Sequence, residues 1–215
     1  MRFPKVLIIG QMFDKDSGGG ITLSNLFTGW DSDSIAVLAT KTENPDFSVC
    51  KNVYCIGNLE IERGFPFNLK LTGESSKSGV LNTETELKKK QVLRAKSKPG
   101  KLERIKDRLI ILTGQIHRRR RFLISNELSK WINDFDPDII YTQLSSFEII
   151  QFIRVILKNY HKPLAIHIMD DWPKTITGNQ VEPFKSYWHN RINNGFRQLI
   201  EQASVLMSIS ESMSE

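Results

Sequence analysis

The chain has 215 residues, 40% of them hydrophobic, so it is long enough to bury one sizeable core without disulfide bonds. No window approaches the roughly eighteen uncharged apolar residues of a membrane span, and the N-terminus lacks the apolar run of a signal peptide. The two cysteines, Cys50 and Cys55, match no zinc-binding spacing, and we expect both to be buried thiols in a reducing compartment. These features predict a cytoplasmic protein.

The net charge of +6 is unevenly distributed along the chain. Residues 88–121 contain fourteen Lys and Arg against two acids, Glu103 and Asp107, so this stretch carries +12 and the rest of the chain −6. One segment therefore supplies all of the basicity, which makes it a candidate surface for an anionic partner.

Six apolar runs predict β-strands, and helical patterns separate most of them. Most of the runs are continuous rather than alternating, which is typical of strands covered on both faces. This order of elements predicts an α/β fold with a doubly wound, mostly parallel, Rossmann-like sheet and helices on both faces. The predicted strands cover residues 5–10, 34–40, 52–57, 138–143, 163–169 and 204–209.

After the first predicted strand, three glycines, Gly18, Gly19 and Gly20, open a helix. A glycine-rich helix start at the carboxyl edge of a sheet exposes backbone N–H groups where the helix dipole favours a phosphate. The spacing from Gly10 does not fit the G-x-G-x-x-G fingerprint of dinucleotide-binding proteins, which disfavours a nicotinamide or flavin cofactor. The alternative is that the glycines supply only a tight turn.

Two helices are predicted to contribute to the core. Residues 146–159 are apolar on nearly every side, and Ser145 and Glu148 have the spacing of a capping box at the start of this helix. Residues 182–202 carry apolar side chains every three to four positions, as on one helical face, and we expect them to be core. These side chains are Phe184, Trp188, Ile192, Phe196 and Leu199.

Two other segments are expected to lie outside the compact fold. Residues 60–100 have few large apolar side chains and many Ser, Thr and Gly, which predicts a mobile polar excursion. At the other end, Ser210 suits a helix N-cap, and the helix that it would start runs out of chain within six residues. We therefore expect the chain to be cut from a longer protein.

The fifth predicted strand ends in a polar cluster that contains His167, Asp170 and Asp171. Carboxylates at the carboxyl end of a sheet strand lie where a ligand docks, and one of them would hydrogen-bond, or accept a proton from, an incoming hydroxyl. The alternative is that an aspartate caps a helix and that His167 is an ordinary core histidine. A metal site is disfavoured, because no third donor residue stands at a suitable spacing.

The basic segment contains an amphipathic helix that begins near Lys101. Leu102, Ile105 and Leu109 recur at helical spacing, and basic side chains fall on another face. Such a helix suits an anionic membrane surface, and the alternative is a solvated charged face packed on the sheet by its apolar side. Nucleic acid is disfavoured, because no aromatic residues interleave with the charges. The basic candidates for a membrane or acceptor surface are Arg104, Arg108, Arg118, Arg119, Arg120 and Arg121.

Five motifs in the same order resemble the N-terminal half of GT-B glycosyltransferases of family 4. The resemblance spans the chain except for about residues 60–100. The motifs are Lys5-Val-Leu-Ile-Ile-Gly with Gly18-Gly-Gly, Asn25-Leu-Phe-Thr-Gly-Trp30, Pro137-Asp-Ile-Ile-Tyr141, His167-Ile-Met-Asp-Asp-Trp-Pro173 and Ala203-Ser-Val-Leu-Met-Ser-Ile-Ser-Glu211.

This resemblance implies that residues 1–215 form the acceptor-binding domain of a two-domain retaining enzyme, whose C-terminal donor-binding domain is absent from this chain. The donor would be a nucleotide-diphospho-sugar, used without a metal ion or a cofactor, and the acceptor a glycan or lipid-linked glycan in cell-surface polysaccharide or lipopolysaccharide assembly. The enzyme would work in the cytoplasm, at the inner face of the plasma membrane. The chain alone would be inactive, because the glutamate pair and the sugar-nucleotide pocket belong to the missing half.

The same resemblance assigns roles to individual residues. It makes Gly18, Gly19 and Gly20 the cleft loop that reaches the donor phosphates, and it places Asp170 or Asp171 beside the acceptor hydroxyl. The sequence departs from the family here, because family members commonly end this strand with a histidine or a His-Asp pair. In this chain Met169 precedes the two aspartates, and His167 lies further back.

Two other functions compete with this interpretation. One is an NAD-dependent sugar-nucleotide epimerase or dehydrogenase, which needs the dinucleotide fingerprint that the sequence lacks. The other is a non-catalytic α/β interaction module that binds nucleic acid or a protein partner through residues 88–121.

Overall fold

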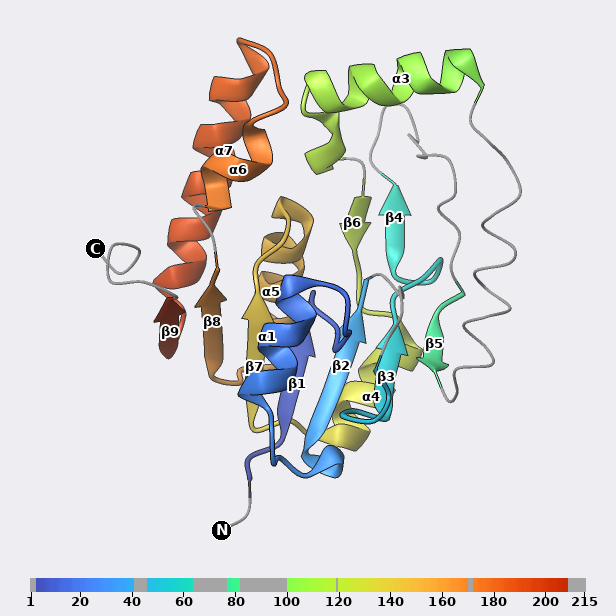
Figure 1. Ribbon diagram of the computed structural model, residues 1–215, viewed down its shortest axis with the longest axis vertical. Coiled ribbons are helices and arrows are strands. Elements are labelled where there is room, and N and C mark those ends of the chain that lie inside the picture. The colour runs from blue at the N-terminus through green and yellow to red at the C-terminus, as the bar shows by residue number, and fades with distance from the viewer. Residues whose placement is uncertain are drawn as a thin grey trace.

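The computed structural model describes residues 3–40, 46–63, 77–81, 100–118, 120–169 and 172–208. Within these ranges, seven strands form one sheet in the order β5-β3-β2-β1-β7-β8-β9 (Figure 1), and β4 and β6 form a separate antiparallel pair. Every neighbouring pair in the large sheet is parallel except β3 and β5. The strands are β1 Val6–Ile9, β2 Ile35–Ala39, β3 Asn52–Cys55, β4 Ile61–Arg63, β5 Gly79–Leu81, β6 Arg120–Phe122, β7 Ile139–Gln143, β8 Leu164–Ile168 and β9 Val205–Ser208.

The six parallel strands have the order of a doubly wound Rossmann-like sheet. The chain builds outward from β1 to β2 and β3, then returns to the other side of β1 and builds outward again through β7, β8 and β9. This arrangement confirms the predicted fold class and all six predicted strands. The order of the strands reverses between β1 and β7, and ligands of such sheets bind beyond the carboxyl ends of the strands at that point.

Helices cover both faces of the sheet (Figure 1). Helix α1 packs on one face, while α4, α5 and α7 contribute side chains to the core on the other. Helix α3 lies across the carboxyl edge, beside the upper part of α6 and α7. The helices are α1 Gly18–Leu26, α3 Lys101–Leu112, α4 Asn126–Phe135, α5 Phe147–Tyr160, α6 Trp172–Thr177 and α7 Phe184–Ile200, with short 3₁₀ helices at Ser32–Ser34 and Gln115–Arg118.

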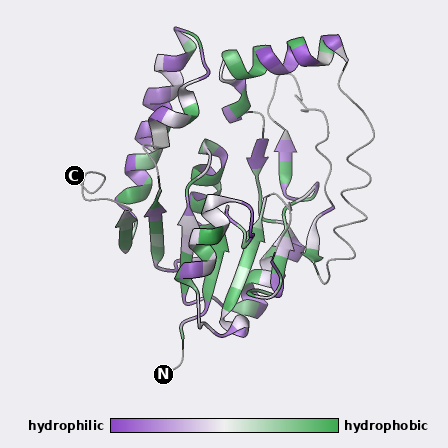
Figure 2. Cartoon of the chain, viewed as in Figure 1, coloured by the Kyte–Doolittle hydropathy of each residue, from purple (hydrophilic) through white to green (hydrophobic). Residues whose placement is uncertain are grey.

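Alternate side chains of each central strand enter different cores. In β1, Leu7 and Ile9 pack toward α4 and α5, whereas Val6 and Ile8 pack toward α1. All four are essentially inaccessible to solvent, which explains why the sequence shows a continuous apolar run instead of an alternating one. The central strands are accordingly the most hydrophobic part of the fold in Figure 2.

The prediction that the apolar side chains of residues 182–202 lie in the core is largely confirmed on α7. Trp188, Ile192 and Leu199 are buried and Phe196 packs against the same core, but Phe184 is partly exposed. Phe184 is the first residue of α7, so it lies beyond the end of the surface that the helix covers.

The start of α5 differs from the prediction by one residue. Ser146, and not Ser145, is the N-cap, because its hydroxyl accepts a hydrogen bond from the backbone N–H of Ile149. Glu148 does not close a capping box; it forms the ion pair described below. The expectation for the cysteines is confirmed, since Cys50 and Cys55 are buried free thiols, and burial raises the pKa of Cys50 to about 12.

Two short strands lie inside residues 60–100, which the sequence predicts to be a mobile excursion. β4 pairs with β6, and β5 extends the large sheet beside β3. Backbone pairing to an existing strand edge does not require large apolar side chains, so composition gave no sign of these strands. The remaining expectations for this excursion, and those for Ser210 and the chain end, fall outside the described residues.

Candidate functional site

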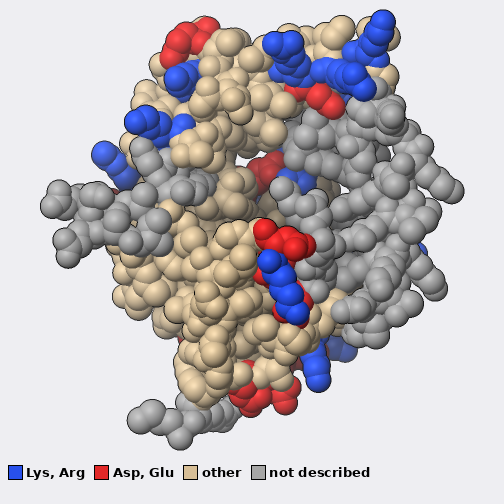
Figure 3. Space-filling view, in the orientation of Figure 1, with Lys and Arg blue, Asp and Glu red and all other residues tan. Residues whose placement is uncertain are grey.

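A cavity of about 380 Å³ opens at the carboxyl edge of the sheet, beside the point where the strand order reverses. Thr40, which follows β2, and Ser145 and Ser146, which follow β7, form the side of the cavity nearest the sheet. The other walls come from the 3₁₀ helix Gln115–Arg118, from β6, from the N-terminal turn of α5 and from the segment after α6. Figure 3 shows a hollow on the face of the molecule that it displays, with acidic and basic side chains inside it.

A buried ion pair forms one wall of this cavity. Nη2 of Arg120, on β6, lies 2.8 Å from Oε2 of Glu148, on α5, and Nε of Arg120 also faces this carboxylate. The Arg120 side chain is only 18% exposed and that of Glu148 only 5%. The guanidinium also lies over the Phe122 ring, 5.4 Å from its centre. The pair therefore joins β6 to α5, and among the described residues that line the cavity its two formal charges cancel.

His117 and Gln180 also line the cavity and contact each other. Both are buried, and Nε2 of His117 is hydrogen-bonded to the side-chain amide of Gln180. Burial lowers the pKa of His117 to about 4, so the ring is neutral at pH 7. Oε1 of Gln180 has no hydrogen-bond partner within the described part of the chain. The side chain of Gln180 thus keeps a buried polar atom without a partner among the described residues.

Helix α3 ends at this cavity and is fixed there by α7 and the segment before it. The backbone N–H of Val181 donates to the carbonyl of Leu112 at 3.0 Å, and the Trp188 indole N–H donates to the carbonyl of Thr113 at 3.1 Å. Gly114 turns the chain with a φ of 67°, and a Cβ there would lie 2.1 Å from the Trp188 ring. Only glycine fits both this backbone conformation and this approach.

The three glycines at the start of α1 lie outside the cavity lining, and side chains of the same chain lie close to Gly19 and Gly20. Asp14 accepts hydrogen bonds from the backbone N–H groups of Asp16 and Ser17 and from the Ser17 hydroxyl. A Cβ on Gly20 would lie 2.3 Å from Oδ2 of Asp14, and a Cβ on Gly19 would meet the Gln11 amide at 3.0 Å. Gly20 thus makes room for an internal carboxylate.

The Asp14 carboxylate lies at the helix start where the sequence predicts a phosphate site. Ser17 caps α1 by accepting from the backbone N–H of Gly20, and the Asp14 carboxylate already lies at the positive end of this helix. Gly18 is exposed and has open space around it. A phosphate at this helix start would meet the negative charge of Asp14, which opposes its binding.

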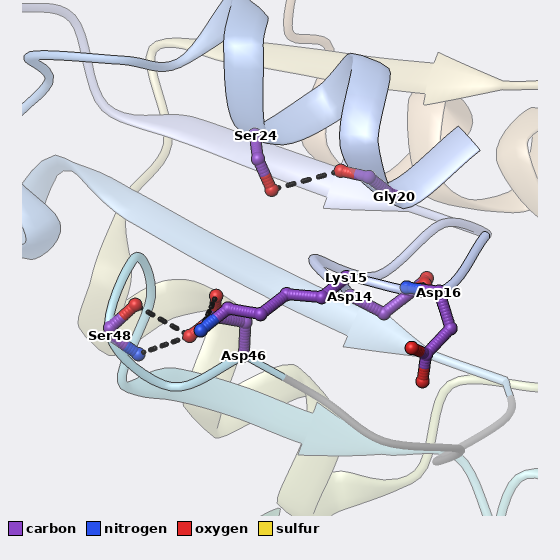
Figure 4. A network of polar contacts seen from close by, with 7 residues as sticks. All are labelled: Asp14, Lys15, Asp16, Gly20, Ser24, Asp46 and Ser48. Atoms are coloured by element: carbon purple, nitrogen blue, oxygen red, sulfur yellow. Dashed lines mark hydrogen bonds and ion pairs between the residues drawn. The ribbon is translucent and has the colours of Figure 1, made fainter. Parts of the chain in front are cut away.

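The loop before α1 is also tied to the loop before β3 (Figure 4). Lys15 lies 3.2 Å from Oδ2 of Asp46, and Ser48 donates its backbone N–H and its hydroxyl to the other oxygen of the same carboxylate. Hydrogen bonds from Ser48, together with the Lys15 ammonium, lower the pKa of Asp46. These contacts tie the loop before α1 to the loop before β3.

His167 belongs to a polar cluster on the α1 side of the sheet. Its Nδ1 lies 2.8 Å from the Tyr141 hydroxyl, which also accepts from the Gln143 side chain at 3.1 Å. Burial raises the pKa of Tyr141 to about 12 and lowers that of His167. The buried Tyr141 hydroxyl stays protonated at pH 7 and is hydrogen-bonded to both Gln143 and His167. Asp170 and Asp171 lie outside the described residues, so their expected juxtaposition with His167 stays a prediction.

The structure separates the basic candidates into different environments. Arg104, Arg108 and Arg118 are exposed, and Arg121 forms only a loose surface pair with Glu62 at 3.7 Å. Arg120 is paired inside the cavity wall and is not part of that surface, and Arg119 lies outside the described residues. Figure 3 shows Lys and Arg side chains gathered over α3.

The apolar side of α3 does not pack on the sheet along most of its length. Leu102 is 83% exposed, Ile105 58% and Leu109 56%, and among the residues of this helix whose burial is described only Ile110 is buried. Of the two alternatives for this helix, the packed one is therefore wrong for its first two turns. Helix α3 is therefore an amphipathic helix whose apolar face and basic face are both exposed over most of its length.

Comparison with known proteins does not identify a family. A scan against protein-family models finds no match, and searches of curated proteins and of solved structures find none either. The resemblance to family 4 glycosyltransferases therefore rests on the sequence motifs, whereas the fold rests on the structure.

Sequence reasoning missed the residues that build the cavity. Glu148 was assigned to a helix cap and Arg120 to a basic surface, while His117 and Gln180 were given no role. One signal for Glu148 was present, because it is the only acid in an otherwise apolar helix and needs a cationic partner when buried. Nothing in the local pattern pointed to Gln180.

The buried ion pair predicts different outcomes for two adjacent arginines. Replacing Arg120 by Met leaves the Glu148 carboxylate buried and unpaired, so the free energy of unfolding should fall by about 3 kcal/mol. Replacing Arg121 by Met removes only an exposed pair and should cost less than about 1 kcal/mol. Urea denaturation of both variants measures the difference. Equal effects would show that the Arg120–Glu148 pair does not hold β6 to α5.

The different surroundings of Gly20 and Gly18 predict different effects when each glycine is replaced by alanine. Gly20→Ala forces a Cβ against the Asp14 side chain and its carbonyl and should destabilise the protein by about 2 kcal/mol. Gly18→Ala meets open space within the first helical turn and should leave stability unchanged or raise it by up to about 1 kcal/mol. Thermal and urea unfolding report both values. A Gly20→Ala variant as stable as Gly18→Ala would contradict the assigned role of Asp14.

Proposed function

We propose that this chain is the acceptor-binding half of a retaining glycosyltransferase that uses a nucleotide-diphospho-sugar donor. The observation that carries the proposal is the cavity, lined by both polar and apolar side chains, at the carboxyl edge of a Rossmann-like sheet, beside the reversal of strand order. A glycosyltransferase of the GT-B type needs such a cavity to hold the acceptor while a second domain delivers the activated sugar. The order of the sequence motifs supports the same assignment.

The chemistry of the cavity suits an acceptor hydroxyl. Serine hydroxyls, an amide with a spare hydrogen-bonding group and a neutral imidazole surround a space with an apolar wall. These groups donate to and accept from hydroxyl groups, and they orient a bound molecule. In this proposal the chain binds and positions the acceptor, while the chemistry of the donor belongs to the other domain.

The glycine loop supports the proposal less directly than the cavity does. The Asp14 carboxylate lies where the donor phosphate was expected, so a phosphate contact at Gly18 requires the carboxylate to move or to be neutralised. The same carboxylate weighs against the competing NAD-dependent enzyme, whose pyrophosphate would bind at the start of the first helix. We therefore base the proposal on the cavity and keep the donor contact as an expectation of the resemblance.

The acceptor role is tested with the full-length protein and a pair of variants. Asn179 is exposed at the cavity wall, so Asn179→Phe fills the cavity without disturbing the core, and Asn190→Phe places the same side chain on the exposed surface of α7. The assay measures nucleoside diphosphate release from a panel of nucleotide-diphospho-sugars in the presence of glycosides and polyprenyl-linked glycans. We expect acceptor-dependent release that Asn179→Phe lowers at least tenfold, through a higher KM for the acceptor. Equal loss in both variants, or no acceptor dependence with any donor, would contradict the proposal.

We also propose that α3 places the protein on the cytoplasmic face of an anionic membrane. No helix within the described ranges is long and apolar enough to cross a membrane. Helix α3 exposes Leu102, Ile105 and Leu109 and carries exposed basic residues beside them, the combination that binds the headgroup region of a bilayer. This arrangement favours an acceptor held at a membrane, and it weighs against nucleic acid, which does not require an exposed apolar stripe.

Membrane association through α3 predicts that removing basic residues from this helix weakens binding to vesicles. Removing two charges with Arg104→Ser and Arg108→Ser should weaken binding to phosphatidylglycerol vesicles about 30-fold, because each basic residue contributes about 1 kcal/mol. The matched control is Lys158→Ser with Arg197→Ser, which removes two exposed charges from α5 and α7. Vesicle co-sedimentation at fixed ionic strength measures both. Equal weakening in the two double variants would show a response to net charge instead of to α3.

A further inference from the structure

We infer that the cavity selects an uncharged, hydroxyl-rich ring compound, such as a neutral mono- or disaccharide unit, and rejects phosphorylated or uronic-acid sugars. This inference rests on the proposed function, because it names the class of acceptor for the same cavity. Three observations support it: the ion pair of Arg120 and Glu148, the unsatisfied group of the Gln180 amide and the volume of the cavity.

The charged groups at the cavity wall neutralise each other. Arg120 is the cation that an anionic ligand would seek, but Glu148 already binds it at 2.8 Å, and both side chains are largely buried. An incoming phosphate or carboxylate would have to displace Glu148, and this would leave a buried carboxylate without its partner. His117 adds no positive charge at neutral pH. A neutral ligand meets no such penalty.

The spare polar groups match hydroxyls. Gln180 is buried, and one of its amide groups has no hydrogen-bond partner in the described structure, so a ligand that pairs with it relieves an unsatisfied group. If the amide is turned over, its NH₂ becomes the free group and its oxygen accepts from His117. A sugar hydroxyl satisfies either arrangement, because it both donates and accepts.

The size and the apolar surface fit a small ring. Ile111, Ile116 and Ile149 line the cavity together with the polar groups, and they offer an apolar wall to the C–H face of a ring. A volume of about 380 Å³ lies at the low end of the range of about 300–1,000 Å³ that is usual for ligand sites. The cavity thus holds one or two sugar units of a longer acceptor.

The test compares matched neutral and anionic probes on the full-length protein. The neutral probes are methyl glucoside and methyl N-acetylglucosaminide, and the anionic probes are glucose 6-phosphate and methyl glucuronide. Binding is followed by NMR titration of the side-chain amide resonances, including that of Gln180. We expect at least one neutral probe to bind at least tenfold more tightly than either anionic probe. Tighter binding of an anionic probe would overturn the inference.

Two variants test the origin of this selectivity. Glu148→Gln keeps the shape of the side chain but removes the negative charge that Glu148 presents to Arg120, so binding of glucose 6-phosphate should improve at least tenfold. Gln180→Met should weaken the neutral probe at least tenfold, whereas the control Gln198→Met, on the exposed surface of α7, should not. A Glu148→Gln variant that is folded but gains no affinity for the phosphate would refute the charge argument.

The outcomes separate this inference from the function on which it rests. If anionic sugars bind at the cavity, the selectivity is wrong and the acceptor role stands. If no carbohydrate of either kind shifts the Gln180 resonances, and acceptor-dependent release of nucleoside diphosphate is also absent, both the selectivity and the proposed function fail.

Discussion

The ion pair between Arg120 and Glu148 holds the carboxyl edge of this protein together. It joins β6 to the first turn of α5, and β6 in turn pairs with β4 and continues the 3₁₀ helix that carries His117. A charged residue on the buried side of α5 is tolerated only because a cation from a distant segment reaches it. The ion pair thus contributes to one wall of the cavity, while Val181 and Trp188 hold the end of α3.

The fold was predictable from the sequence to the extent that burial determines it. Parallel strands covered on both faces require continuous apolar runs, so residues such as Leu7 and Val37 were enough to place the central strands. The short strands β4 and β5 carry no such run and form by backbone pairing at existing edges, which side-chain patterns do not report. The cap of α5 was displaced by one residue because two adjacent serines offer the same chemistry.

The site was less predictable, because its groups come from distant segments. Gly18, Gly19 and Gly20 marked the correct helix start, but the sequence could not show that Asp14 would fold back onto it. Likewise, a run of arginines gave no means of telling the buried Arg120 from the exposed Arg121 next to it. Local spacing locates elements; which side chains meet across the sheet edge depends on tertiary packing.

The amphipathic helix and the cavity wall are consecutive parts of one short stretch of chain, since α3 leads through the 3₁₀ helix directly into β6. Only a few residues of chain therefore separate the cavity from a surface that α3 contacts. A glycolipid confined to that surface would reach the protein by lateral diffusion in two dimensions, with its sugar already at the height of the opening. The encounter rate would then depend on the density of the lipid in its own leaflet and not on its solubility in water.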